Sequence, residues 1–207
     1  MKYFRKKLSS DRLHERIFFS VILWAALFFG VMILSYFLLP EGLLKNRNPL
    51  QNWETSNNTF ILVLQIFFYN QMSVLVIIAA SLFAKKKAKE ANYLSLGYLT
   101  FFTLMAINGV VVGTWSFSVE SEPLPLFRRV IRTFDLLHRA GLWEMMGQLL
   151  ITCAVARIAI ILTSGKDTVT RKFGAIRLEK PEKMAFASGF VLMLIGAIVE
   201  SVAIHSL

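Results

Sequence analysis

Five long stretches of this chain consist almost entirely of apolar residues, and they alternate with shorter segments that hold most of the charges. The hydrocarbon core of a bilayer is about 30 Å thick, so a helix needs about 20 apolar residues to cross it. The stretches are residues 17–39, 60–83, 96–117, 142–162 and 184–207. This pattern predicts an all-α, polytopic helical membrane protein with about five transmembrane helices, folded as a single membrane domain over residues 1–207.

The composition agrees with this class of protein. Hydrophobic residues make up 56% of the chain and charged residues 17%, whereas soluble domains average about 45–50% apolar and about 25% charged residues. The formal net charge is nevertheless +10, a value that by itself also fits a nucleic-acid-binding protein. The single cysteine, Cys153, excludes an intramolecular disulfide and a zinc site built from several cysteines.

The basic residues gather in segments that would lie on one side of a membrane. The N-terminal segment and the loops 84–95 and 163–183 together hold sixteen Lys and Arg residues, whereas the loops 40–59 and 118–141 hold six. Because cytoplasmic loops carry the excess of Lys and Arg, we predict a cell-membrane protein with its N-terminus in the cytoplasm and its C-terminus outside. No nucleic-acid partner is expected, since no stacking aromatic residues accompany the basic cluster at Lys85.

Residues 125–139, between the third and fourth stretches, show the periodicity of an amphipathic helix. Its apolar positions are Phe127, Val130, Ile131, Phe134 and Leu137, and its interfacial basic face is formed by Arg128, Arg132 and Arg139. A helix of this kind lies in the membrane interface with its basic face toward the headgroups. It either leads only into the fourth transmembrane helix, or it covers a cavity or a docked peptide.

Amide and ionisable side chains fall inside the apolar stretches, where an unsatisfied polar group is costly. Six of them are Asn70, Gln71, Asn108, Glu144, Gln148 and Glu200. We predict that they form an intramembrane polar network, in which interhelical hydrogen bonds hold the helices together.

The two glutamates in this set, Glu144 and Glu200, are also candidate catalytic or metal-binding residues. Their positions along the helices place Glu144 and Glu200 near the outer surface, at the level of His138 and His205. A carboxylate beside a histidine can act as a general acid or base, and the four residues together could bind a metal ion. The alternative is a purely structural role. Because no known catalytic motif accompanies them, no catalytic residue, metal site or cofactor is assigned.

The third stretch contains Gly109 and Gly113, four residues apart. This spacing lets two membrane helices approach closely, and we expect the two glycines to serve helix packing within the chain rather than dimerisation.

A series of short motifs runs from the second stretch to the C-terminus. The motifs are Phe68-Tyr69-Asn70, Asn108-Gly109 to Gly113, Gly141-Leu142-Trp143-Glu144, Ala154 to Arg157, and Ala197-Ile198-Val199-Glu200. In this order and spacing the chain resembles the stage II sporulation protein M family of polytopic bacterial and archaeal membrane proteins. It departs from the family pattern at Ala140, which stands in place of a histidine, and at Met145, since the family commonly has a proline after the glutamate.

The resemblance implies two settings in the bacterial cytoplasmic membrane. One is the anchoring of a peptidoglycan-degrading complex during sporulation, and the other is the maturation, export or immunity of a circular bacteriocin. We therefore predict a scaffold or accessory component of a membrane machine for cell-envelope remodelling or for bacteriocin maturation, export or immunity. The alternative is an intramembrane enzyme or transport component that acts on a hydrophobic peptide through the outer-leaflet glutamates. Expected partners are membrane lipids, other membrane proteins or a hydrophobic peptide, and a second copy of the chain.

Overall fold

The computed structural model of this chain describes residues 2–45, 47, 56–86, 92–117, 124–165, 167–172 and 176–205. The side chains of Lys2, Arg139 and Ala140 lie outside the described part. The helices are α1 (Lys2–Leu8), α2 (Leu13–Leu38), α3 (Thr59–Ser81), α4 (Leu96–Gly113), α5 (Leu126–Leu136), the π-helical turn η2 (Leu137–Gly141), α6 (Leu142–Val155) and α7 (Lys180–His205). The strands are β1 (Phe83–Lys86), β2 (Tyr93–Ser95), β3 (Ile161–Ser164) and β4 (Asp167–Thr170).

Four helices, α2, α3, α4 and α7, are long and apolar enough to cross a membrane. They correspond to four of the five predicted stretches, and their ends differ from the predicted ends by a few residues. Polar side chains at two helix starts explain where the chain enters the helix. The side chain of Asn58 accepts hydrogen bonds from the Phe60 and Ile61 backbone amides before α3, and Ser95 accepts one from Gly97 before α4. The all-α polytopic class is confirmed.

The fourth predicted transmembrane helix, residues 142–162, is shorter than predicted. Helix α6 has 14 residues, which at about 1.5 Å per residue span only about 21 Å, and residues 161–164 continue as strand β3. The sequence suggested a longer span because most residues of this segment are apolar. The apolar character of α6 is explained by contact with protein, since nine of its 14 residues are buried.

The structure also contains a four-stranded sheet, formed by residues that were predicted to lie in the basic loops 84–95 and 163–183 and at the adjoining ends of two transmembrane helices. Its strand order is β2-β1-β3-β4, with β1 parallel to β3 and the other pairs antiparallel. Strands of three or four residues are too short to show a period-2 pattern. Gly165, directly after β3, is a local indication of the hairpin between β3 and β4. Its φ of +64° is the positive value that type I′ and II′ hairpin turns require at their first central residue.

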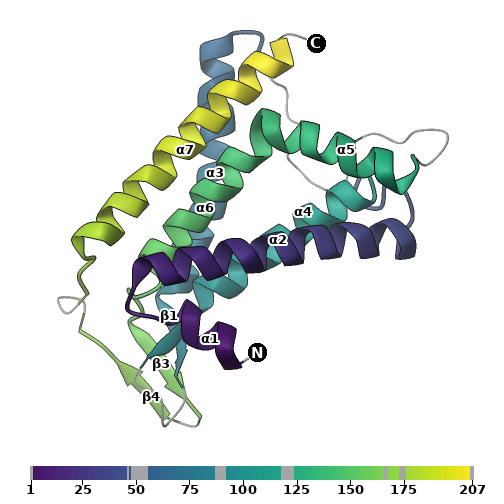
Figure 1. Ribbon diagram of the computed structural model, residues 1–207. Helices are drawn as coiled ribbons and strands as arrows, with labels where there is room; N and C mark the ends of the chain where they lie inside the picture. Colours follow the sequence, from purple (N-terminus) through teal and green to yellow (C-terminus); the bar gives the residue numbers. More distant parts are fainter. Residues whose placement is uncertain are drawn as a thin grey trace.

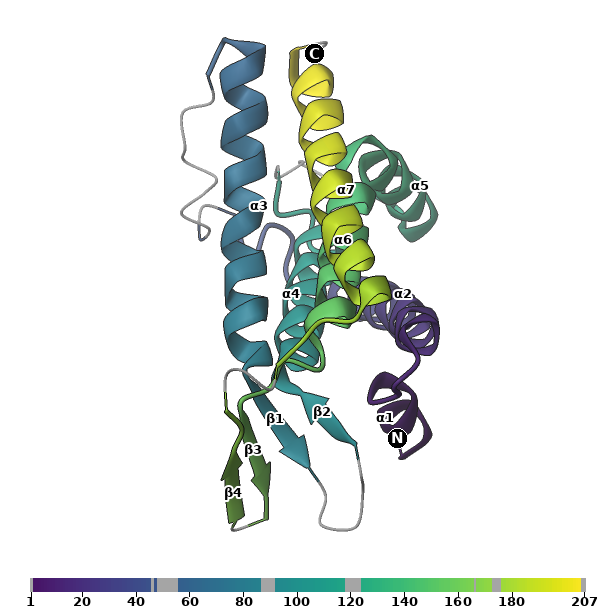
Figure 2. The same cartoon turned by 90° about the vertical axis from the view of Figure 1, so that its left-hand side faces the viewer.

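The sheet and α1 lie at one end of the helices, and α5 lies toward the other (Figure 1). Helices α3 and α7 run side by side above the sheet (Figure 2). The predicted cytoplasmic segments meet at the sheet end, where the Arg5 Nη2 atom donates to the Lys85 carbonyl oxygen at 3.3 Å and Arg157 Nη2 lies 3.0 Å from Asp11 Oδ1. The orientation of this end toward the cytoplasm stays a prediction.

Helices α2 and α4 approach closely where α4 carries glycine. A Cβ atom at Gly109 would lie 2.9 Å from the Phe28 carbonyl oxygen, and one at Gly113 would lie 2.4 Å from the Met32 carbonyl oxygen. The buried residues of α2 recur every three or four positions, and they are Arg16, Ser20, Trp24, Phe28, Met32 and Ser35. Gly109 and Gly113 therefore lie at the contact of α4 with α2.

A second glycine contact joins α6 to α7, and the sequence analysis did not identify it. A Cβ atom at Gly147 would lie 2.6 Å from the Gly189 carbonyl oxygen, and one at Gly189 would lie 2.7 Å from that of Gly147. The two backbones thus touch without intervening side chains, and α7 covers α6 along this line.

We predict that Gly113→Ala lowers the stability of the protein by about 1–3 kcal/mol, because the added methyl group must push α2 and α4 apart. The midpoint of thermal unfolding in detergent micelles measures this loss. Gly30→Ala on α2 is the matched control, since a Cβ atom there meets no atom within 4 Å. An equal loss for both variants would contradict the close packing of α2 on α4.

Candidate functional site

Three of the six predicted network residues meet between α3, α6 and α7. The Asn70 Nδ2 atom donates a hydrogen bond to Glu144 Oε1, and the side chains of Glu144 and Glu200 are hydrogen-bonded to each other. An ionised carboxylate can only accept hydrogen bonds, so two carboxyl groups can be joined by a hydrogen bond when one of them carries a proton. We call Asn70, Glu144 and Glu200 the carboxyl cluster.

The backbone of α7 allows this contact because Gly196 faces the start of α6. A Cβ atom at Gly196 would lie 3.0 Å from Glu144 Cγ and 3.1 Å from Trp143 Cβ. The Glu144 side chain therefore lies directly against the α7 backbone, one helical turn before Glu200. The Gly196-to-Glu200 spacing was the sequence signal that could have indicated this contact.

The other candidates lie elsewhere. Gln71 Nε2 donates to the Phe67 carbonyl oxygen of its own helix at 3.3 Å, Gln148 is buried, and Asn108 is exposed. The two ring nitrogen atoms of His205 lie 2.9 and 3.1 Å from the carbonyl oxygens of Ser201 and Asn57.

His138 is exposed on η2, and no hydrogen bond joins it to the carboxyl cluster among the described residues. Within that same part of the chain, no three His, Cys, Asp or Glu side chains are grouped closely enough to hold a metal ion. The structure therefore offers the two glutamates as a pair, without either histidine.

A buried ion pair lies at the opposite end of the helices. The Arg16 Nη2 and Glu182 Oε1 atoms are 2.6 Å apart, and the two side chains are 1% and 4% exposed. Glu182 Oε2 also accepts from the Glu179 backbone amide at 2.9 Å. From the sequence, Arg16 was predicted to be one of the cytoplasmic charges that set the topology. The residues next to Arg16 in the sequence do not indicate that it is buried, because its partner Glu182 is 166 residues away.

A second buried arginine holds the amphipathic helix α5. Arg129 is fully buried; its Nη2 atom lies 2.7 Å from Glu41 Oε1 and its Nη1 atom donates to the Gly113 carbonyl oxygen at 3.3 Å. Its guanidinium lies 5.1 Å from the centre of the Trp115 ring. Trp115 has a φ of 48°, a left-handed conformation that is unusual for a bulky residue.

The amphipathic helix was predicted correctly as a helix, but its buried side is formed by Arg129 and Thr133. The apolar residues Phe127, Ile131 and Phe134 are 75%, 52% and 55% exposed, as suits a helix whose apolar face contacts lipid. Arg128 and Arg132 of the predicted basic face are also exposed, while the side chain of Arg139 lies outside the described residues.

No family model matches this chain, and neither a curated protein nor a solved structure does. The resemblance to the sporulation family stays a prediction that rests on the order and spacing of the motifs.

We predict that Glu144→Gln leaves stability near the wild-type value, whereas Glu144→Leu lowers it by about 1–3 kcal/mol. A glutamine can accept from Asn70 and donate to Glu200, as a protonated glutamic acid does. A leucine leaves both neighbours without a partner. The midpoint of thermal unfolding in detergent distinguishes the two variants, and equal losses would show that a proton between the carboxyl groups is not what holds them.

We also predict that Arg129→Gln releases α5 from the helices beneath it, because glutamine cannot reach both Glu41 and the Gly113 carbonyl oxygen. Amide hydrogen exchange over residues 126–141 should become faster, while exchange in α6 changes little. The exposed neighbour provides the control, and Arg128→Gln should leave the exchange rates of α5 unchanged. Faster exchange in both variants would mean that Arg129 has no special role.

Proposed function

We propose that this chain is a non-catalytic subunit of a membrane assembly, which it joins through the exposed face of α4. The observation that carries the proposal is Asn108, an exposed amide on a membrane helix that has no hydrogen-bond partner among the described residues. Asn108 is five residues before the end of α4, about 8 Å along the helix axis.

The surroundings of Asn108 are apolar. The adjacent residue on the same helix, Ile107, is apolar and 47% exposed, so the surface beside Asn108 would contact hydrocarbon in an isolated copy. An amide in hydrocarbon lacks the hydrogen bonds that water provides. A helix of another membrane protein can supply them, and such interhelical bonds contribute about 0.6–2 kcal/mol each.

The carboxyl cluster supports a structural role for the remaining polar groups. Asn70, Glu144 and Glu200 satisfy one another across three helices. Two cavities at the sheet end of the molecule are lined by neither Glu144 nor Glu200. These features favour the scaffold over the alternative of an enzyme or transport component that acts through the glutamates.

The resemblance to the stage II sporulation protein M family suggests two settings for such an assembly. One is a complex that remodels the cell envelope, and the other is a complex for the maturation, export or immunity of a circular bacteriocin. In both settings the partner is another membrane protein or a hydrophobic peptide, which matches the apolar surroundings of Asn108.

A photoreactive amino acid at position 108 tests this proposal in native membranes. We expect it to give a discrete protein adduct, whereas the same probe at Leu34, an exposed apolar position on α2, gives only lipid adducts. Asn108→Leu should weaken association with the partner found in this way by about three- to thirtyfold. The proposal is wrong if position 108 reacts only with lipid and Asn108→Leu changes nothing.

A further inference from the structure

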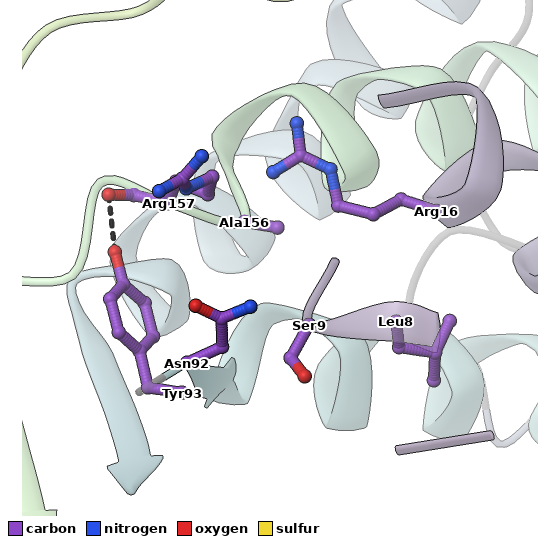
Figure 3. A pocket seen from close by; sticks show the side chains of 7 residues that line it. All are labelled: Leu8, Ser9, Arg16, Asn92, Tyr93, Ala156 and Arg157. Atoms are coloured by element: carbon purple, nitrogen blue, oxygen red, sulfur yellow. Dashed lines mark hydrogen bonds between the residues drawn. The ribbon is translucent and has the colours of Figure 1, made fainter. Parts of the chain in front are cut away.

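Two cavities of about 240 and 70 Å³ lie at the sheet end of the helices. Tyr93 and Arg157 line both of them. The smaller cavity is bounded by the chain between α1 and α2, by β2 and by the end of α6 (Figure 3). The larger one extends toward the sheet and the start of α7. We call the two together the basic cavity.

Four cationic side chains from four parts of the chain line the larger cavity, namely Lys86, Arg157, Arg171 and Arg177. Two carboxylates, Glu179 and Glu182, also line it. Glu182 is paired with Arg16 and Arg157 with Asp11, which leaves Lys86, Arg171 and Arg177 against Glu179. The cations facing this space therefore exceed the available negative charge, and a cavity with this balance attracts an anion.

The surrounding structure holds two of these arginines in place before any ligand arrives. Arg171 Nη1 donates to the Tyr93 hydroxyl at 3.1 Å and to the Ala159 carbonyl oxygen at 3.2 Å. Tyr93 in turn donates to the Arg157 carbonyl oxygen (Figure 3), and Arg157 Nη2 lies 3.0 Å from Asp11 Oδ1. Lys86 lies directly opposite Tyr93 in the β1–β2 pair, which puts their side chains on one face of the sheet.

Arg16 is the independent observation that points to a ligand. It is 1% exposed and lines the smaller cavity, and its guanidinium is turned toward the side of the cavity where Arg157 lies (Figure 3). Glu182 engages its Nη2 atom, but its Nε and Nη1 atoms have no hydrogen-bond partner among the described residues. A buried donor without an acceptor is destabilising, and an anionic oxygen in this cavity would satisfy it.

We propose that the basic cavity binds a phosphate group. Several arginine N–H groups converge on it from different elements, and this arrangement suits an anion with several acceptor oxygens. The cavity lies beside the ends of four helices that are long and apolar enough to cross a membrane, and basic pockets at the ends of transmembrane helices bind anionic headgroups. The phosphate belongs either to an anionic phospholipid or to a soluble phosphate compound. This site is independent of the proposed contact at Asn108, which lies on another part of the molecule.

The test compares the full-length protein with the double variant Lys86→Gln/Arg177→Gln. Neither side chain has an ion-pair partner among the described residues, so the variant leaves the Arg16–Glu182 and Arg157–Asp11 pairs intact. The matched control is Lys6→Gln/Lys183→Gln, which removes two charges from exposed side chains that are not among the residues lining the cavity.

Two measurements distinguish the sources of the phosphate. In the first, inorganic phosphate is titrated by calorimetry into protein purified in a neutral detergent, at constant chloride concentration. In the second, the protein is incorporated into phosphatidylcholine nanodiscs that contain one quarter phosphatidylglycerol, and retained lipids are identified by native mass spectrometry. We expect saturable phosphate binding, preferential retention of phosphatidylglycerol, or both.

The double variant should weaken that binding by about tenfold or more, while the control binds as the wild type does. Binding in the first measurement assigns a soluble phosphate compound, and retention in the second without binding in the first assigns a lipid headgroup. The proposal is overturned if neither ligand binds, or if the double variant and the control weaken binding equally. Because cross-linking at position 108 uses a different site, this result leaves the proposed function untouched.

Discussion

Arg16 and Glu182 stand at the starts of α2 and α7, and their ion pair joins the first long helix to the last. Removing one partner of such a pair leaves a buried charge uncompensated, which is strongly destabilising. The ion pair also affects where other segments of the chain lie. It places the start of α7 against α2, so the sheet, the end of α6 and the N-terminal segment all meet around the same arginine. The basic cavity lies where these segments meet. Two nitrogen atoms of Arg16 have no hydrogen-bond partner there among the described residues, since Glu182 engages only the third.

Other charged side chains in the molecule also need a partner from another segment of the chain. Arg129 under α5 is matched by Glu41 and by rings above its guanidinium, and Glu144 is matched by Asn70 and Glu200. In each case a charged or polar group on an apolar helix finds its partner on a distant segment of the chain. These contacts determine which helices are neighbours, since apolar surfaces alone prefer one another no more than they prefer lipid. Glycines then determine how close the neighbours come, as at Gly113 against α2 and Gly147 against α7. Asn108 differs from these groups, because it is exposed and has no hydrogen-bond partner among the described residues.

Long apolar segments were predictable from the sequence, and single contacts were not. The helices α2, α3, α4 and α7 follow from length and hydropathy, and α5 follows from its periodicity. The length of α6 was overestimated, because a helix buried in protein and a helix surrounded by lipid are equally apolar. The strands β1 and β3 were missed, since four residues carry too little pattern and Lys85 and Lys86 were fully explained as topological charges. Of the candidate site, Glu144 and Glu200 were expected at one level and do lie together, but Asn70 replaces the two histidines beside them.

The sequence by itself determined that this chain is a polytopic helical membrane protein, and it identified the few polar residues within its apolar segments. It could do so because hydropathy and helix length are local properties, readable one segment at a time. The tertiary structure decided which of those polar residues meet, which face of each helix is buried, and that two basic loops form one sheet beside Arg16. Those outcomes depend on partners up to 166 residues apart. On helices such as α2, whose apolar residues surround the whole helix, no periodicity indicates the direction in which a partner lies.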